Sequence, residues 1–538
     1  MKLNKRFRWL MLSAISGVLM WLGWCPHPFP VLLLFGFVPL LMLEKEITDQ
    51  STGKDNRDVF IFSYISFLIW NWPTCWWVGN TTSPGSGMFA NCANPLLMSI
   101  PFLLFHITRK KFGHWIGYSS LIAFWLSFEF IHLRWELTWP WLTLGNGFAS
   151  FPQIIQWYEF TGVEGGTLWI WLCNVLLFLI FTNKKFNTTL IVTTVVLVFQ
   201  PIILSLMQYS RHNSAEGLRT KNIVVVQPNI DPYNEKFDRS TLKTQMETLT
   251  GLSKQKINQE TDYLVWPETA LPQGVWLDEL QTDPSIKECK KLIKKFPKLN
   301  LVTGATAEME YDSAATSTAR YEEVNQKYYD VFNAALQINN SDTIQIYKKS
   351  KLVPGAERMP YPGLFKFLEP LAVNMGGITG SLGTQEHRSV FFSDDSTGIA
   401  PVICYESIFG EYLTEYIQRG AGLIFIMTND GWWGNTDGHK QHLAYASIAA
   451  IETRRCIARS ANTGTSCFID LKGNISQATD WWQPTVINAT LSVNHDLTFY
   501  VKHGDYIARI GNVISIILLL TLIVKRFVPS FLNNRTWN

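Results

Sequence analysis

The segment Gly398-Ile-Ala-Pro-Val-Ile-Cys404 is a short, apolar and β-branched run that predicts a buried strand ending at a cysteine. A helical pattern begins soon after it, at about Ile408. A side chain at a strand-to-helix turn is exposed at the end of the sheet, near the positive end of the helix dipole, which favours a thiolate. The segment therefore predicts a βα unit with a candidate nucleophile, Cys404, at its turn. A buried structural thiol is the common alternative for a single free cysteine.

Two other segments carry reactive side chains at comparable positions. Trp266-Pro-Glu268-Thr places Glu268 just past a predicted strand, and Tyr347-Lys-Lys349-Ser places Lys349 at the end of another. Either charge taken alone is typical of a solvated surface residue. Taken together with Cys404, they supply the carboxylate, amine and thiol that acyl transfer through a thioester requires. The thiolate attacks, the carboxylate moves protons, and the ammonium lowers the thiol pKa and stabilises the oxyanion.

The region around these three residues alternates short β-branched runs with amphipathic helical patterns, which predicts an α/β layered domain. The predicted strands are Asn222–Val226, Tyr263–Trp266, Asn300–Gly304, Val331–Ile338, Thr343–Tyr347, Ile399–Cys404, Leu423–Met427, Thr465–Leu471 and Thr485–Val493. The predicted helices are Thr241–Lys256, Pro284–Lys295, Ile408–Arg419 and His442–Arg459. Residues 308–326 are polar without periodicity, and we expect an exposed loop there.

The rest of the chain has the composition of a membrane protein. Apolar residues make up 47% of the 538 residues and charged residues only 17%, and the apolar residues are clustered. A span needs about 20 residues, or somewhat fewer with apolar flanks. Eight runs meet this requirement: Trp9–Trp24, Val31–Leu43, Val59–Val78, Asn94–Ile107, Trp115–Leu133, Gly165–Thr182, Thr188–Met207 and Ile510–Val524. We therefore expect a transmembrane domain over 1–207, a catalytic domain over 208–505, and a last transmembrane helix with a tail over 506–538.

Basic residues set the expected orientation. They precede the first span and follow the fourth, sixth and eighth: Lys2, Lys5, Arg6, Arg8, Arg109, Lys110, Lys111, Lys184, Lys185, Lys525 and Arg526. If the spans alternate, all of these residues fall on one side, which the positive-inside rule makes cytoplasmic. The catalytic domain then lies outside the cytoplasm. A cleaved signal peptide is the alternative for the first run, but a second span follows almost at once and no small-x-small cleavage site is evident.

Composition also argues against several functions. The net charge of +3, without a basic stripe, predicts no nucleic-acid partner. The eight cysteines form no CxxC motif or Cys/His cluster, so we expect no metal site. Cys289, Cys456 and Cys467 fall in the predicted soluble part; their spacing does not decide between disulfides and buried free thiols, and buried free thiols are the commoner case.

The order Glu268, Lys349, Cys404 resembles the triad of the nitrilase, or carbon–nitrogen hydrolase, superfamily. The surrounding motifs fit too: Val225-Val-Gln-Pro-Asn229 and Thr428-Asn-Asp-Gly-Trp-Trp-Gly434. With the predicted spans included, the chain resembles the apolipoprotein N-acyltransferase family of the bacterial inner membrane over nearly its whole length. Further segments that carry this resemblance are 139–145 and 449–464.

This resemblance implies a multi-pass α-helical bundle joined to an extracytoplasmic nitrilase-like αββα sandwich. It also implies a reaction in two steps, without a cofactor. A phospholipid, typically phosphatidylethanolamine, acylates Cys404, and the α-amino group of the diacylglyceryl-Cys of an apolipoprotein then takes the acyl chain. The partners implied are these two substrates and the surrounding membrane lipids, and the protein is expected to be a monomer.

Residue roles follow from the same resemblance. Glu268 is the general base, and Lys349 with backbone N–H groups near Tyr405 holds the oxyanion. The family's pocket positions fall on Glu357, Tyr405 and Glu406. Trp432 and Trp433 form either an apolar lid over the lipid or ordinary aromatic core.

One loop departs from the family pattern. Leu352-Val-Pro-Gly-Ala-Glu357 keeps the spacing of Glu357 from Lys349 but lacks the aromatic residue of Val-Pro-Phe-Gly-Glu. The family pattern therefore does not determine the shape of this loop. Four charged or titratable residues also lie at the outer end of the fifth predicted span: Glu129, His132, Arg134 and Glu136. They fit a lipid head-group site or simple anchoring equally well.

Three other functions compete with this interpretation. A membrane-tethered amidase would transfer acyl groups to water, but eight spans exceed what a tether needs. A non-catalytic domain would bind lipid or protein, although all three triad residues are present. A transporter would be expected to show broken helices or internal repeats, which are not evident.

Overall fold

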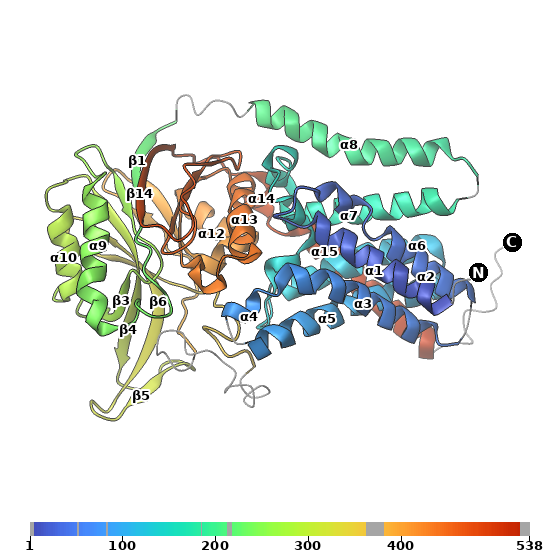
Figure 1. Ribbon diagram of the computed structural model, residues 1–538, viewed down its shortest axis with the longest axis horizontal. Helices are drawn as coiled ribbons and strands as arrows, with labels where there is room; N and C mark the ends of the chain where they lie inside the picture. The colour runs from blue at the N-terminus through green and yellow to red at the C-terminus, as the bar shows by residue number, and fades with distance from the viewer. Residues whose placement is uncertain are drawn as a thin grey trace.

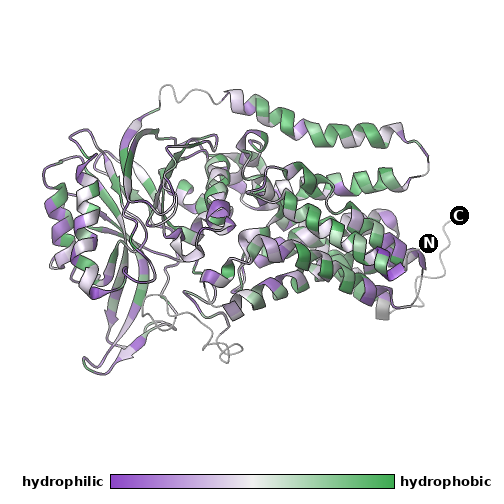
Figure 2. Ribbon diagram, viewed as in Figure 1, coloured by the Kyte–Doolittle hydropathy of each residue, from purple (hydrophilic) through white to green (hydrophobic). Residues whose placement is uncertain are grey.

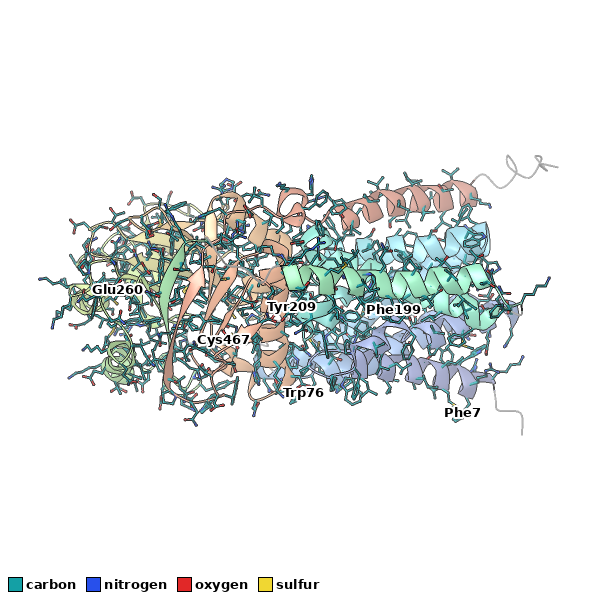
Figure 3. The ribbon with its side chains drawn as sticks, turned by 90° about the horizontal axis from the view of Figure 1, so that it is seen from above. Phe7, Trp76, Phe199, Tyr209, Glu260 and Cys467 are labelled. Carbon is teal, nitrogen blue, oxygen red and sulfur yellow. The ribbon has the colours of Figure 1, made fainter. Side chains whose placement is uncertain are left out.

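The computed structural model describes residues 5–50, 53–81, 84–183, 185–211, 218–361 and 381–527. A bundle of long helices and a pair of β-sheets lie end to end and give the molecule an elongated shape (Figure 1). Figure 3 shows Phe7 in the bundle and Glu260 in the sheets at opposite ends, with Trp76 and Tyr209 near the junction.

The bundle contains a helix at every predicted span. Its helices are α1 (Lys5–Gly23), α2 (Val38–Gln50), α3 (Asp55–Cys75), α4 (Val78–Thr81), α5 (Pro84–Phe112), α6 (His114–His132), α7 (Tyr158–Thr182), α8 (Thr188–Arg211) and α15 (Tyr506–Phe527). Apolar residues dominate these helices (Figure 2). Of the described helices, α5, α7, α8 and α15 are long and apolar enough to cross a membrane by length and composition.

The last helix returns to the first part of the chain. α15 packs against α6, and the hydroxyl of Ser127 donates a 2.8 Å hydrogen bond to Ser515 across this contact. α8 lies at the edge of the bundle beside α7 (Figure 1), where Trp169 Nε1 donates to the carbonyl of Leu197 at 2.9 Å. Large apolar side chains of α8 such as Phe199 and Ile203 are more than half exposed, at 53% and 55%, as expected for a surface that faces lipid.

The other half contains two sheets. The strands of the eight-stranded sheet are β1 (Thr220–Gln227), β2 (Tyr263–Val265), β3 (Leu271–Trp276), β4 (Asn300–Tyr311), β5 (Arg320–Glu322), β6 (Lys327–Ile338), β7 (Gln345–Lys348) and β14 (Thr485–Ser492). Their order is β14-β1-β2-β4-β6-β5, with β3 beside β4 and β7 beside β6. The six-stranded sheet has the order β13-β12-β11-β10-β9-β8. Its strands are β8 (Phe391–Phe392), β9 (Gly398–Ile403), β10 (Ala421–Thr428), β11 (Cys456–Ala461), β12 (Cys467–Ile469) and β13 (Ile475–Ser476).

The two sheets pack face to face between layers of helices. Tyr263 of β2 meets Phe425 of β10 edge-on, with ring centroids 5.1 Å apart. The outer layer contains α9 (Leu242–Lys254) and α10 (Pro284–Ile293). The layer next to the bundle contains α12 (Gly410–Gln418), α13 (Asp437–Thr453) and α14 (Phe499–His503), as Figure 1 shows. The expected αββα sandwich is therefore present.

Two local predictions differ from the structure, and the alternatives for three cysteines are resolved in favour of free thiols. The predicted helix His442–Arg459 ends at Thr453, because Arg454 adopts a φ of 49° and the next residues pair with β10 as β11. Residues 308–326 are only partly a loop, because β4 continues to Tyr311 and β5 pairs with β6. In both places pairing with another strand overrides the local pattern. Cys289, Cys456 and Cys467 are buried free thiols, so the possible disulfides do not form among them.

Polar contacts join the bundle to the sheets. The carboxylate of Glu452 in α13 accepts the Val163 N–H at 2.9 Å, and Tyr445 donates its hydroxyl to the carbonyl of Trp141 at 2.8 Å. Arg134, at the end of α6, pairs with Glu411 and Asp505. Buried contacts of this kind fix the two halves against each other at the level of the candidate site.

The four titratable residues at the end of α6 make protein contacts. Glu129 accepts hydrogen bonds from Trp125 Nε1, the Leu144 N–H and the Thr167 hydroxyl at 2.9, 2.8 and 2.7 Å. His132 Nε2 lies 2.9 Å from Asn94 Oδ1, and Glu136 accepts from Arg358 at 3.0 Å. With the ion pairs of Arg134, these contacts favour anchoring over a lipid head-group site.

Candidate active site

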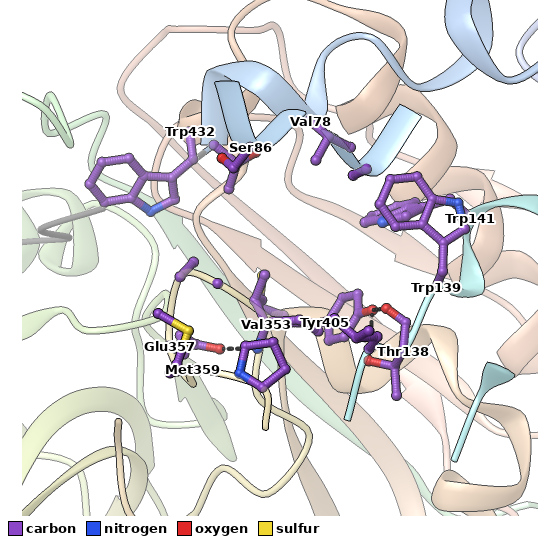
Figure 4. Close-up of a pocket in the computed structure, with 18 of the residues that line it drawn as sticks. Val78, Ser86, Thr138, Trp139, Trp141, Val353, Glu357, Met359, Tyr405 and Trp432 are labelled. Carbon is purple, nitrogen blue, oxygen red and sulfur yellow. Dashed lines mark hydrogen bonds between the residues drawn. The ribbon is translucent and has the colours of Figure 1, made fainter. Parts of the chain in front are cut away.

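A cavity of about 390 Å³ lies between the bundle and the sheets and is lined from both sides (Figure 4). The bundle supplies mainly apolar side chains, among them Val78, Phe89, Leu97, Trp139 and Trp141. The sheets supply polar side chains, among them Glu268, Asn333, Lys349, Glu357 and Cys404. A molecule with an apolar chain and a polar reacting group matches this division.

The structure brings the three predicted reactive residues together in this cavity. Glu268 lies between β2 and β3, Lys349 directly follows β7, and Cys404 directly follows β9. Each is at or just past the end of a strand, as the sequence predicts. Strand ends from both sheets therefore supply the polar wall.

Lys349 is the cation at the centre of the polar wall. Its Nζ donates to Glu268 Oε1 at 3.1 Å and to Glu357 Oε1 at 2.8 Å, and the side chain is 1% exposed. Burial lowers the pKa of Lys349, but the charges of Glu268 and Glu357 outweigh it and hold that pKa well above its ordinary value. Lys349 is therefore a permanent ammonium that is shared by two carboxylates.

Cys404 has an unusual backbone conformation and a protonated thiol. Its φ is 49°, in the left-handed region that costs a non-glycine residue about 1–3 kcal/mol. Burial raises the pKa of the thiol, the charge of Glu268 raises it further, and the charge of Lys349 only partly opposes this. The expectation of a lowered thiol pKa is therefore wrong. A 3₁₀ turn, η7 (Cys404–Ile408), also separates Cys404 from the first turn of α12.

The sequence does not predict two further residues of the site: Asn333, which lines the cavity, and Lys236, which is outside the described cavity lining and contacts Glu268. Asn333 on β6 donates its Nδ2 to Glu268 Oε1 at 2.8 Å and to Glu357 Oε1 at 3.1 Å. Lys236 donates its Nζ to the backbone carbonyl of Glu268 at 2.8 Å, and burial lowers its pKa to about 8. Lys236 stands in a polar loop where a lysine normally means solvent exposure, and no motif marks Asn333 on its strand.

In the loop 352–357, which departs from the family pattern, the carboxylate of Glu357 still contacts Lys349. Glu357 Oε2 accepts the Val353 N–H at 2.8 Å, which closes the loop on itself, while Oε1 faces Lys349. Pro354, Gly355 and Ala356 line the cavity directly. The loop backbone therefore forms part of the wall, and Glu357 contacts Lys349 without the aromatic residue of the family pattern.

Tyr405 lines the cavity, whereas Glu406 lies beneath it. Glu406 is fully buried and is absent from the cavity lining among the described residues. Its Oε1 accepts from the hydroxyls of Tyr347 and Tyr412 at 2.6 and 2.7 Å and from the Ser350 N–H at 2.8 Å. The prediction of a pocket position is therefore wrong for Glu406, which supports the segments after β7 and β9 from below.

The two tryptophans after β10 differ in their surroundings. Trp433 is 5% exposed and packs against Trp77, Trp141 and His442, with ring centroids 5.4, 5.5 and 5.0 Å away. It is aromatic core between the two halves. Trp432 is half-buried beside Tyr233 and lies across the pocket from Trp139 in Figure 4. Only Trp432 keeps the character of a lid residue.

Tyr405 also forms a hydrogen bond between the sheets and the bundle, and its contribution to stability can be tested. Its hydroxyl donates to the carbonyl of Thr138 at 3.0 Å (Figure 4). Tyr405→Phe leaves this buried carbonyl without the bond, so we expect a loss of about 1–3 kcal/mol of stability with acyl transfer retained within roughly tenfold. Thermal unfolding in detergent measures the loss. The control Tyr321→Phe removes an exposed hydroxyl and should leave the midpoint unchanged, and an unchanged midpoint for Tyr405→Phe would contradict the prediction.

Comparison with known families covers both halves of the chain. Residues 16–176 match the family described as apolipoprotein N-acyltransferase N-terminal domain, and residues 223–495 match the carbon-nitrogen hydrolase family.

Whole-length relatives carry both parts. The apolipoprotein N-acyltransferase of Chlorobaculum tepidum is 30% identical over 530 residues, which cover 96% of each chain. That of Geobacter metallireducens is 26% identical over 513 residues, covering 93% of this chain and 92% of the relative. Among solved structures, Saccharomyces cerevisiae Nit3 of the nitrilase superfamily aligns with a TM-score of 0.34 at 15% identity, over 52% of this chain and 93% of Nit3.

Proposed function

Because this chain belongs to the apolipoprotein N-acyltransferase family, we propose that it acylates lipoproteins through a thioester on Cys404, with a phospholipid as donor. The chain is a membrane protein and an acyltransferase that N-acylates apolipoproteins. The donor we propose is phosphatidylethanolamine, and the acceptor is the α-amino group of a diacylglyceryl-Cys. The observation that carries the proposal is the cavity itself, where one wall holds Glu268, Lys349 and Cys404 and the other is apolar.

In the first step Cys404 takes the acyl group. As the thiol attacks the ester carbonyl carbon, Glu268 accepts its proton, which the raised thiol pKa makes necessary. The oxyanion that forms is stabilised by the Lys349 ammonium and by the N–H of Tyr405. The C–O bond then breaks, and Glu268 returns the proton to the leaving oxygen of the lysophospholipid.

In the second step the acceptor amine attacks the thioester carbonyl. Glu268 removes a proton from the attacking amine, and the same donors hold the second oxyanion. The C–S bond breaks, the new amide leaves on the lipoprotein, and the Cys404 sulfur recovers the proton. The apolar wall keeps water away from the thioester between the two steps.

We propose eight membrane spans, with residues 208–505 on the periplasmic side of the bacterial inner membrane, after residues 1–207 and before 506–538. In support, a helix lies at each predicted span. The basic ends of α5 and α15 also lie side by side, because Lys525 Nζ donates to the Lys111 carbonyl at 3.1 Å. Exposed Trp76 and half-buried Tyr209 lie near the junction in Figure 3, where interfacial aromatic residues are common.

Intact mass after incubation with phosphatidylethanolamine tests the proposal. The wild type should gain one acyl mass that hydroxylamine removes, and Cys404→Ala should gain none. Cys92→Ala, which removes a thiol of α5 outside the cavity lining, is the matched control and should gain the mass. Release of free fatty acid without an adduct or an amide product would favour an amidase. No reaction with folded protein would favour a binding domain.

A further inference from the structure

A chain of buried polar side chains contacts the backbone of Cys404 from outside the cavity lining. The backbone carbonyl of Cys404 accepts a hydrogen bond from the Ser407 hydroxyl at 2.7 Å, and His442 Nε2 lies 3.2 Å from the same oxygen. Ser407 Oγ and His442 Nε2 are 3.0 Å apart. Neither Ser407 nor His442 is among the described residues that line the cavity.

The other edge of the imidazole is held by an ion pair. His442 Nδ1 lies 3.1 Å from Asp430 Oδ1, and Arg459 donates to Asp430 Oδ2 at 2.7 Å. Burial raises the pKa of the Asp430 carboxyl, but Arg459 and His442 outweigh it and hold that pKa below its ordinary range. Asp430, His442 and Arg459 are each at most 1% exposed. The ion pair therefore remains charged and fixes the imidazole from behind.

The acceptors determine where the imidazole carries its proton. A carbonyl oxygen can only accept, so His442 Nε2 must donate to Cys404. Ser407 then donates its own proton to the same carbonyl, and its oxygen shares the single Nε2 proton of His442 with that carbonyl. The arrangement resembles a Ser–His–Asp triad, but the Ser407 hydroxyl is already committed to Cys404 and is 2% exposed. Ser407 is therefore unsuited to be a nucleophile.

In a trans peptide the C=O and N–H bonds point in opposite directions. The Cys404 carbonyl points to Ser407 and His442, so the N–H of Tyr405 points away from them, towards the side that Cys404 and Tyr405 line. We propose that His442, with Ser407, is a positioning residue that holds the Cys404–Tyr405 peptide so that the Tyr405 N–H faces the oxyanion. The same bonds hold Cys404 in its left-handed conformation, with φ 49°.

This inference rests on the proposed thioester chemistry, and its test compares two reactions of the same sulfur. Acylation by phosphatidylethanolamine needs an oxyanion donor, whereas alkylation by iodoacetamide does not. For His442→Leu we expect acylation of Cys404 in a single turnover to fall about 10²-fold, the usual effect of losing one such donor. The alkylation rate should change less than about threefold, because an SN2 reaction at carbon forms no oxyanion.

His442→Gln is the conservative variant, because its side-chain amide can donate to the Cys404 carbonyl from near the Nε2 position. It should restore acylation to within about tenfold of wild type. Ser407→Ala removes one of the two hydrogen-bond donors to the Cys404 carbonyl and leaves Asp430 and Arg459 paired. It replaces His442→Leu as the test if that variant fails to fold. Acylation of Cys404 in Ser407→Ala should fall by about tenfold.

Several results would overturn the inference. Wild-type acylation rates in both His442→Leu and Ser407→Ala would show that the peptide needs no such support. Equal losses of acylation and alkylation, with no recovery in His442→Gln, would indicate a general packing role. A wild type that forms no thioester would instead refute the proposed function itself, and the intact-mass experiment reports that outcome separately.

Discussion

Lys349→Met is expected to reduce acyl transfer by roughly 10⁴-fold or more. The Lys349 ammonium both holds Glu268, the proposed base, and donates to the proposed oxyanion, so the variant loses two contributions to catalysis. The ammonium is the hydrogen-bond donor to Glu268 and Glu357, at 3.1 and 2.8 Å, and the charged donor available to the oxyanion. Without it the two carboxylates face each other in a buried wall with no cation between them. Removing one partner of a buried charge pair costs about 3–5 kcal/mol, so we expect lower stability as well.

A double variant separates stability from activity at Lys349. Lys349→Met with Glu357→Gln leaves a single buried carboxylate, so the thermal midpoint should recover while acyl transfer does not. Lys348→Met is the matched control, because Lys348 lies over the Phe332 ring at 3.9 Å and outside the cavity lining. Single-turnover acylation and thermal unfolding measure both effects. More than a tenth of wild-type acylation in the single variant would contradict the prediction.

Short-range patterns were sufficient to locate the proposed triad. Glu268, Lys349 and Cys404 each follow a compact β-branched run, and the ends of these runs come together where the two sheets of the sandwich pack against each other. The helices of the bundle were equally predictable, because long apolar runs without charges permit few other structures. These features depend on residues near each other in the chain, which is why the sequence alone predicts them.

The supporting residues depend on contacts between distant segments and were not predictable. Lys236 is buried only because its loop packs under Glu268, and His442 reaches Cys404 only because α13 packs against η7. The local pattern of β11 predicts the end of a helix, because its pairing with β10 is a tertiary contact. Glu406 matches a family pocket position by spacing, yet the packing of Tyr347 and Tyr412 places its carboxylate beneath the site.

Glu268→Gln should lower acylation of Cys404 by about 10²–10⁴-fold near neutral pH, the usual contribution of a positioned base. The amide keeps the size of the side chain and an oxygen that can accept from Asn333 and Lys349, so the fold should be retained. What is lost is the acceptor for the thiol proton. Because burial keeps the pKa of Cys404 raised even without the charge of Glu268, only a small fraction of the thiol ionises spontaneously.

The pH profile distinguishes a lost base from a distorted site. Below its pKa the thiolate fraction rises tenfold for each pH unit, so residual acylation in Glu268→Gln should rise about tenfold per unit between about pH 7 and about pH 9. The wild type should change much less, because Glu268 removes the proton during attack. Glu308→Gln on β4, outside the cavity lining, should behave as wild type. A Glu268→Gln profile parallel to the wild type would mean that another group removes the thiol proton, and the buried amine of Lys236, with its pKa of about 8, would then be the candidate base.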